Sequence, residues 1–179
     1  MMNNTKRLRQ LEILGTVFVV VTGTLAHFVY DWTGRQDLIG LFFAKNESTF
    51  EHLKLLFYPF LLYSVFEYIL LRHYSLKEYA RKLPCGKLFG LLAGLLSIIS
   101  IFYTYTGVFG KSILAIDISI FIIAVIISFM VSYYLMINET CLCRANPGFY
   151  LTAAGILILC FICFSIRPPE IPLFLPPKS

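Results

Sequence analysis

Apolar residues occur in five long runs that are separated by short polar segments. The runs are Leu11–Tyr30, Leu53–Arg72, Gly86–Thr106, Ile113–Met136 and Phe149–Ile166. Each is close to the roughly 17–25 residues that a helix needs to cross the hydrocarbon core of a bilayer. The pattern predicts an all-α fold, a polytopic membrane bundle of five transmembrane helices that forms a single integral membrane domain over residues 1–179.

The composition supports this interpretation and raises one alternative. Hydrophobic residues make up 58% of the chain and its mean hydropathy is +0.77, which is too apolar for a soluble domain. Lys6, Arg7 and Arg9 precede the first run, and Thr24-Leu25-Ala26 loosely resembles a signal-peptide cleavage site. Since the run Leu11–Tyr30 is long for a signal-peptide core, we expect a retained helix.

The distribution of lysine and arginine predicts an orientation in the plasma membrane. With a cytoplasmic N-terminus and an extracellular C-terminus, nine of these residues lie inside and six outside. The nine are Lys6, Arg7, Arg9, Arg72, Lys77, Arg81, Lys82, Lys87 and Arg144, and the six are Arg35, Lys45, Lys54, Lys111, Arg167 and Lys178. The net charge of +5 is therefore a topology signal, and we expect the lipid bilayer, not nucleic acid, as a partner.

Three cysteines fall on the predicted cytoplasmic side, where thiols stay reduced. They are Cys85, Cys141 and Cys143. Cys141-Leu-Cys143 could begin a metal site, but no second pair and no histidine lie near it in the sequence. A plain turn leading into Asn146-Pro147-Gly148 is the favoured interpretation.

The connecting segments carry their own predictions. In the external loop Asp31–Asn46, the apolar patch Leu38–Ala44 is too short to cross the bilayer and is expected in the interface. The internal segment Tyr74–Cys85 mixes aromatic and basic residues, which is typical of an amphipathic segment on the membrane surface. The tail Arg167–Pro177 contains five of the eight prolines, so we expect an extended, non-helical chain that packs on the outer rim.

Glycines recur every four residues at the start of the third run. Gly86, Gly90 and Gly94 would share one helix face. Glycines on one face let the backbone of a neighbouring helix approach closely. These residues therefore predict helix packing, either within the chain or against a membrane protein partner or a second copy of the chain.

The most polar stretch, Lys45-Asn-Glu-Ser-Thr-Phe-Glu-His-Leu-Lys54, directly precedes the second run. Ser48 and Glu51 fit a capping box, in which each side chain bonds the backbone amide of the other. A helix cap requires only one acceptor. The cap does not explain Asn46, Glu47, His52 and Lys54, and this surplus of polar residues indicates a functional site.

Other polar residues fall at the same depth. Gly23, His27 and Asp31 are spaced i, i+4, so Asp31 could hold His27 in the tautomer that a metal ligand or general base requires. Asp117 lies inside the fourth run, where a carboxylate needs a partner. Its expected partners are Lys54, His27 or Lys111. In contrast, Glu67 is expected to snorkel beside Arg72 and is assigned no role.

All these residues map to the outer membrane boundary. The candidate binding set is His27, Asp31, Asn46, Glu47, Glu51, His52, Lys54, Tyr103, Tyr105 and Asp117. Polar residues gather at membrane interfaces in any case, but two of the three histidines belong to this set. His27, Glu47 and His52 are the candidate ligands of a divalent metal, while the cofactor and any catalytic residue are otherwise unknown.

Three segments carry a resemblance to a known family. They are Gly23–Gly34, Asn46–Pro59 with its Asn-Glu-Ser, Glu-His and Lys residues, and Pro168–Phe174. The whole chain resembles the domain of unknown function 6512 family, an uncharacterised family of small bacterial integral membrane proteins. The chain departs from the family pattern at Phe50, where tryptophan is expected, and in the tail, which lacks an expected aspartate. The resemblance supports the site and implies no activity.

Three functions fit these observations. The first is a binding or transport component that captures a small molecule, lipid head group or ion. The second is an interfacial enzyme that acts on a lipid-linked substrate through a metal or through acid and base groups. The third is a structural polar network that fixes the first loop and the tail over the bundle. No known catalytic motif is present to favour the enzyme.

Overall fold

The computed structural model describes residues 2–138, 143 and 146–176. Five helices of this part are long and apolar enough to cross a membrane. They are α1 (Met2–Trp32), α3 (Thr49–His73), α4 (Lys77–Phe109), α5 (Leu114–Ile137) and α6 (Pro147–Ile166). A short helix α2 (Asp37–Gly40) follows α1, and a 3-10 turn η2 (Pro172–Phe174) follows α6. The predicted all-α fold with five membrane-length helices is confirmed, and it is compatible with a multi-pass membrane protein.

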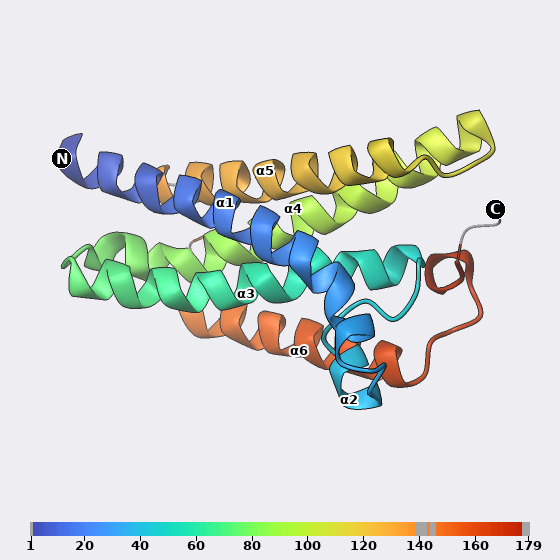
Figure 1. Ribbon diagram of the computed structural model, residues 1–179. Helices are drawn as coiled ribbons and strands as arrows, with labels where there is room; N and C mark the ends of the chain where they lie inside the picture. Colours follow the sequence, from blue (N-terminus) through green and yellow to red (C-terminus); the bar gives the residue numbers. More distant parts are fainter. Residues whose placement is uncertain (1, 139–142, 144–145, 177–179) are drawn as a thin grey trace.

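The five long helices run lengthwise through the bundle, and the two termini lie at opposite ends (Figure 1). We call the end that carries α2, the α4–α5 connection and η2 the site end. We call the other end, which carries the N-terminus and the α3–α4 turn with Arg72, Lys77, Arg81 and Lys82, the basic end. An odd number of long helices places the termini in this way.

Helices α4 and α5 form the most extensive helix pair of the bundle. Gly86, Gly90 and Gly94 lie on the face of α4 that meets α5. A Cβ atom on Gly90 would collide with the carbonyl oxygen of Ser128, and one on Gly94 would collide with the hydroxyl of the same serine. The close approach of the two backbones therefore depends on these small residues.

Helix α4 begins earlier than predicted. The expected surface segment over residues 74–85 is wrong, because only Tyr74, Ser75 and Leu76 form a turn before an unbroken helix starts at Lys77. Ser75 reverses the chain in the left-handed region, with φ of 58°. Leu76 and Leu83 are buried against α1 and α3, so packing draws this segment into the bundle although Pro84 removes one helical donor.

The C-terminal tail packs on the site end. Phe174 is buried and its ring centroid lies 4.5 Å from that of Phe50 at the start of α3. The expectation that the tail has no helical turn is wrong for Pro172–Phe174, which form one turn of 3-10 helix. Proline at the first position of a turn lacks only a donor that the turn does not use.

Cys85 of α4 and Cys143 form a disulfide across 58 residues of sequence. In the structure the two are therefore not the reduced thiols that the sequence analysis expected, because the fold brings together two cysteines that are far apart in the chain. Cys141, the other residue of the suggested metal motif, lies outside the described residues. Structural disulfides persist in oxidising compartments, so this bond favours a basic end that faces the outside of the cell. The count of lysines and arginines favours a basic end that faces the cytoplasm.

Glu67 does not snorkel to the basic end. Its side chain is 0% exposed and lies 2.7 Å from the ammonium of Lys87 on α4, which also contacts Glu12 of α1 at 2.9 Å. The count of lysines and arginines assigned Lys87 to the cytoplasmic side, at the edge of the run Gly86–Thr106, but α4 starts ten residues before it and places it in the core. Three charged residues of three different helices therefore meet inside the bundle.

Candidate functional site

The segment that leads into α3 is fixed by its own side chains. The side-chain oxygen of Asn46 accepts a hydrogen bond from the amide of Ser48 at 2.9 Å, and the Ser48 hydroxyl accepts from the amide of Glu51 at 3.4 Å. The reciprocal half of the predicted capping box is absent, because the Glu51 carboxylate accepts from the amide of Lys45 at 2.8 Å. Asn46 and Ser48 therefore shape the turn.

Glu51 and Lys54 form a buried ion pair that anchors the first loop. The Lys54 ammonium lies 2.8 Å from the Glu51 carboxylate and donates to the carbonyl of Gly40 in α2 at 2.9 Å. The Lys54 side chain is 0% exposed. Because every contact of this pair is with the chain itself, these two predicted site residues hold α2 and the loop against α3.

A second group of polar side chains converges beside this anchor, and we call it the histidine–glutamate cluster. It consists of His27 from α1, Glu47 from the loop and His52 from α3. His27 Nε2 lies 3.5 Å from one Glu47 oxygen and His52 Nε2 lies 3.4 Å from the other. The two imidazole rings stack with centroids 5.4 Å apart. Helix α1 and the segment that leads into and includes the first turn of α3 thus place three metal-ligating groups together.

The backbone sets the tautomer of His52. Its Nδ1 lies 2.9 Å from the carbonyl oxygen of Ser48, which can only accept a hydrogen bond. Nδ1 therefore carries the proton, and the Nε2 of a neutral ring presents its lone pair to Glu47. A lone pair and a carboxylate oxygen repel each other unless a cation or a proton lies between them. This orientation of the second ring nitrogen is the one that metal-ligating histidines show.

The contact lengths in the cluster fit shared ligation better than hydrogen bonding. Direct N–H···O bonds have lengths of about 2.7–3.2 Å, and the two imidazole–carboxylate contacts are longer, at 3.4 and 3.5 Å. Two ligands at about 2.0–2.1 Å from one tetrahedral metal are separated by about 3.3 Å. All three ligand atoms lie within 4.8 Å of one another. The two histidines and the carboxylate are therefore close enough to share one metal ion if the side chains move together by about an ångström.

Asp31 does not join the cluster. Its carboxylate accepts from the guanidinium of Arg35 at 2.8 Å, and this hydrogen bond raises the pKa of Arg35. Both side chains are largely exposed. The predicted orientation of His27 by Asp31 is therefore wrong, and the Nδ1 of His27 is buried without a hydrogen-bond partner among the described residues. Asp31 lies one helical turn beyond His27, and at that position its carboxylate is in solvent and pairs with Arg35.

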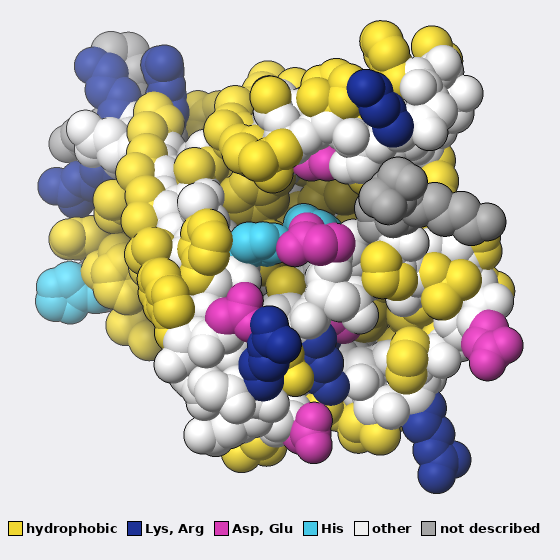
Figure 2. Space-filling model, turned by 45° about the vertical axis from the view of Figure 1, so that its right-hand side comes forward, with side chains coloured by type: hydrophobic (Ala, Val, Ile, Leu, Met, Phe, Trp, Pro, Cys, Tyr) yellow, Lys and Arg dark blue, Asp and Glu magenta, His cyan; other side chains and the backbone are white. Residues whose placement is uncertain are grey.

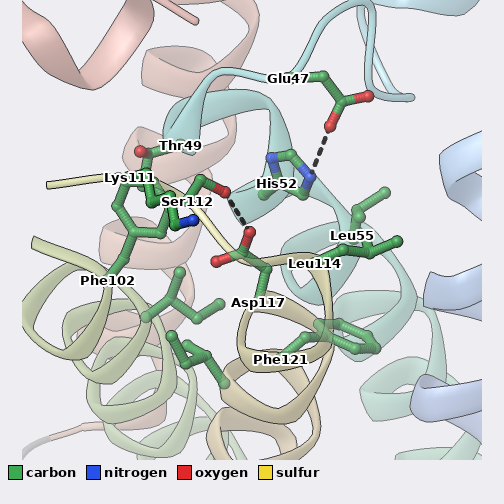
Figure 3. Close-up of a pocket in the computed structure, with 12 residues that line it drawn as sticks. Glu47, Thr49, His52, Leu55, Phe102, Lys111, Ser112, Leu114, Asp117 and Phe121 are labelled. Atoms are coloured by element: carbon green, nitrogen blue, oxygen red, sulfur yellow. Dashed lines mark hydrogen bonds and ion pairs between the residues drawn. The ribbon is translucent and has the colours of Figure 1, made fainter. Parts of the chain in front are cut away.

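The cluster borders a cavity of about 480 Å³ between α3, α4 and α5. Figure 3 shows Glu47 and His52 on one side of it and Asp117, Ser112 and Lys111 on the other. The remaining wall is mainly apolar and includes Leu55, Ile98, Phe102, Leu114, Ile120 and Phe121. Figure 2 shows histidine and acidic side chains at a hollow surrounded by hydrophobic ones. An apolar chamber with polar groups at its rim suits an amphiphilic ligand.

Asp117 is held by hydroxyl groups instead of a cation. Ser112 donates to one carboxylate oxygen at 2.6 Å, and the hydroxyl of Tyr105 donates to the other. The expected ion pairs of Asp117 with Lys54, His27 or Lys111 are not formed. Tyr103 does not reach the cavity and is 38% exposed. The ten predicted site residues thus separate into a cluster, a loop anchor and a hydroxyl-bound carboxylate with its tyrosine, while Asn46 shapes the turn before α3 and Asp31 and Tyr103 lie outside these groups.

The sequence analysis missed two features of this region. Ser112 and Thr49 line the cavity, but neither was among the predicted site residues. The apolar wall also has no signal in the sequence, because its residues resemble those of any membrane helix. The buried Glu12, Glu67 and Lys87 did have a signal, since all three are charged residues inside predicted membrane runs.

Comparisons with known proteins give one match. A model of a family of unknown function, DUF6512, matches residues 1–177, which confirms the resemblance found in the sequence. No curated protein and no solved structure matches the chain.

Proposed function

This chain belongs to the DUF6512 family, and we propose that it binds a divalent transition metal through His27, Glu47 and His52. We propose further that the metal helps to hold the polar head of an amphiphilic ligand in the adjoining cavity. The observation that carries the proposal is the convergence of the three ligand atoms within 4.8 Å at the cavity rim. Imidazole and carboxylate ligands suit zinc and similar metals.

The cavity supports an amphiphilic ligand with an anionic head group. Lys111 lines it and forms no ion pair with any described residue, so its charge is available to a ligand. Three protein ligands leave at least one coordination position of a tetrahedral metal open. A phosphate or carboxylate head could occupy that position while its alkyl chain lies on Leu55, Ile120 and Phe121.

We propose that the site end faces the outside of the cell. The excess of lysine and arginine at the basic end supports this orientation. In that case the Cys85–Cys143 disulfide faces a reducing compartment, and the two cysteines are a dithiol in the living cell.

A metal-dependent hydrolase is the second candidate function. It is favoured by the open coordination position together with Asp117, a carboxylate that lines the same cavity as Glu47 and His52. A zinc-bound water has a pKa near 7 and is a nucleophile at neutral pH. Release of fatty acid or head group from phospholipid vesicles by the zinc-loaded protein, but not by the zinc-free protein, would select this candidate over simple capture.

Zinc binding by the purified full-length protein tests the proposal. Equilibrium dialysis is expected to give one zinc per chain, and Glu47→Gln is expected to weaken binding by at least about tenfold, since changes outside the ligand shell alone cost about 10- to 100-fold. Glu47 is 66% exposed and its described contacts are those with the two histidines, so this variant should fold normally. His52→Gln is expected to have the same effect.

His73 provides the matched control. It is the third histidine of the chain and lies exposed at the basic end of α3, so His73→Gln should leave zinc binding unchanged. Equal affinities of the wild type, Glu47→Gln and His52→Gln would refute the metal site. The contacts of Glu47 would then be ordinary pairs with protonated imidazoles.

A further inference from the structure

A second group of ionisable side chains lies in the interior of the bundle, towards the basic end. Glu12 of α1 and Glu67 of α3 both face the ammonium of Lys87 on α4, at 2.9 and 2.7 Å. All three side chains are at most 5% exposed. We call Glu12 and Glu67 the buried carboxylate pair. Neither the metal proposal nor the loop anchor uses it.

The surroundings of the pair contain one cation and little else that is charged. Ser132 of α5 donates to Glu12 at 2.9 Å. The rings of Phe60, Tyr63 and Phe129 surround the Lys87 ammonium, and the Tyr63 hydroxyl donates to the backbone carbonyl of Leu11. Among the described residues, no other lysine, arginine or histidine forms an ion pair with either carboxylate.

The charges of this group do not balance when every member is ionised. Two carboxylates and one ammonium carry a net charge of −1 in an interior that is shielded from water. An uncompensated charge inside a membrane protein is costly, and two carboxylates that share one site do not readily ionise together. One added proton makes the whole group neutral.

The hydrogen bonds of the two carboxylates differ in a way that fits one proton. Glu12 accepts hydrogen bonds from both Lys87 and Ser132. Glu67 is fully buried, and neither of its oxygens accepts a well-directed hydrogen bond from the described residues. Because the pair is coupled, the proton belongs to both carboxylates.

We propose that the buried carboxylate pair is an intramembrane proton-binding site that holds one proton per chain at neutral pH. A proton suits the site better than a metal ion. A proton that binds a carboxylate forms a neutral carboxyl group, whereas a metal ion would place a second cation beside the Lys87 ammonium. The proton also needs no set of oxygen ligands, and the Lys87 ammonium at 2.7 Å is the one polar contact of the Glu67 carboxylate among the described residues.

A cavity extends from the basic end of the bundle to Lys87, the residue between the two carboxylates. This cavity, of about 830 Å³, lies between α3, α4 and α6, and Lys87 and Ser64 are among its lining residues. Arg72, Lys77 and Arg81 line it at the basic end. The cavity therefore extends from the basic end to the ammonium that joins the two carboxylates, and neither carboxylate nor any residue of the histidine–glutamate cluster lines it.

Infrared spectroscopy of the full-length protein in lipid bilayers tests this proposal. At neutral pH the wild type is expected to show the carbonyl stretch of one protonated carboxyl group. Both Glu12→Gln and Glu67→Gln are expected to lose the signal, because each variant leaves one carboxylate balanced by Lys87. The control Asp31→Asn removes an exposed carboxylate at the other end of the bundle and should keep the signal.

Three results would overturn the proposal. The first is a wild-type spectrum without a protonated carboxyl group at neutral pH, which requires no variant and therefore does not depend on variant folding. The second is a signal that persists in both glutamine variants. The third is a signal that is lost in only one of them, since a proton shared by the pair requires both carboxylates.

Discussion

Replacement of Lys54 by methionine is expected to destabilise the protein strongly through the loop anchor. Methionine retains most of the apolar volume but removes an ammonium that is 0% exposed in the structure. The Glu51 carboxylate would then remain buried with only the Lys45 amide as a donor, and the Gly40 carbonyl would lose its hydrogen bond. Leaving one member of a buried ion pair unpaired costs about 3–5 kcal/mol.

The matched double variant separates this cost from the net contribution of the pair. Glu51→Gln combined with Lys54→Met removes both charges, so its free energy of unfolding should lie between those of the single variant and the wild type. Lys82→Met is the control, because Lys82 pairs with the exposed Glu78 at 3.1 Å and such pairs contribute up to about 1 kcal/mol.

The assay is unfolding in mixed micelles, followed by far-ultraviolet circular dichroism as the fraction of denaturing detergent rises. The expected order of stability is wild type, Lys82→Met, the double variant and Lys54→Met. If Lys54→Met is as stable as Lys82→Met, then Lys54 is not buried against Glu51, and the loop that positions Glu47 is not anchored as described. The reasoning about the site end would then be refuted.

Four further predictions concern other parts of the molecule. Gly90→Ala should lower the free energy of unfolding by about 1–3 kcal/mol through overpacking against α5, while Gly107→Ala in the same helix, with open space around it, should be neutral or stabilising in the same unfolding assay; equal effects would contradict the close packing. Phe174→Ala should cost about 3–5 kcal/mol because it removes a buried ring, and an unchanged unfolding curve would show that the tail is undocked. Lowering the pH should weaken zinc binding, because protonated imidazoles cannot ligate a metal; a pH-independent zinc affinity in dialysis would exclude histidine ligands. In cells quenched with acid, the Cys85 thiol should react with a maleimide polymer without prior reduction. The reaction is measured as a gel shift that is lost in Cys85→Ser. A shift that appears only after reduction would reverse the proposed orientation.

The hydropathy pattern predicts the five long helices because the thickness of a bilayer fixes the length of an apolar run. It does not predict where a helix begins when charged residues are buried. The charges between Arg72 and Lys87 indicated a loop, but α4 starts at Lys77 and Lys87 finds two carboxylates on other helices. Ion pairs between helices leave no periodic pattern in a single sequence, so the partner of a buried charged residue is known only from the three-dimensional structure.

The depth of polar residues in the membrane could be predicted from the sequence, but their direction around each helix could not. His27 and His52 meet because α1 and α3 pack together with these faces inward, whereas Asp31, one turn beyond His27, points to Arg35. Glu47 lies on a loop, where no periodicity fixes the direction of a side chain. Its place between the two histidines depends on the buried Glu51–Lys54 anchor, which local sequence explained only as a helix cap.

X-ray absorption spectroscopy of the zinc-loaded protein tests the central claim most directly, because it measures the ligands of the metal. We predict a first shell of nitrogen and oxygen atoms at about 2.0–2.1 Å with the outer-shell scattering of two imidazole rings, and loss of one ring in His52→Gln. A shell of sulfur atoms at about 2.3 Å would place the metal on cysteines. A shell without imidazole scattering would likewise contradict a metal site at His27, Glu47 and His52.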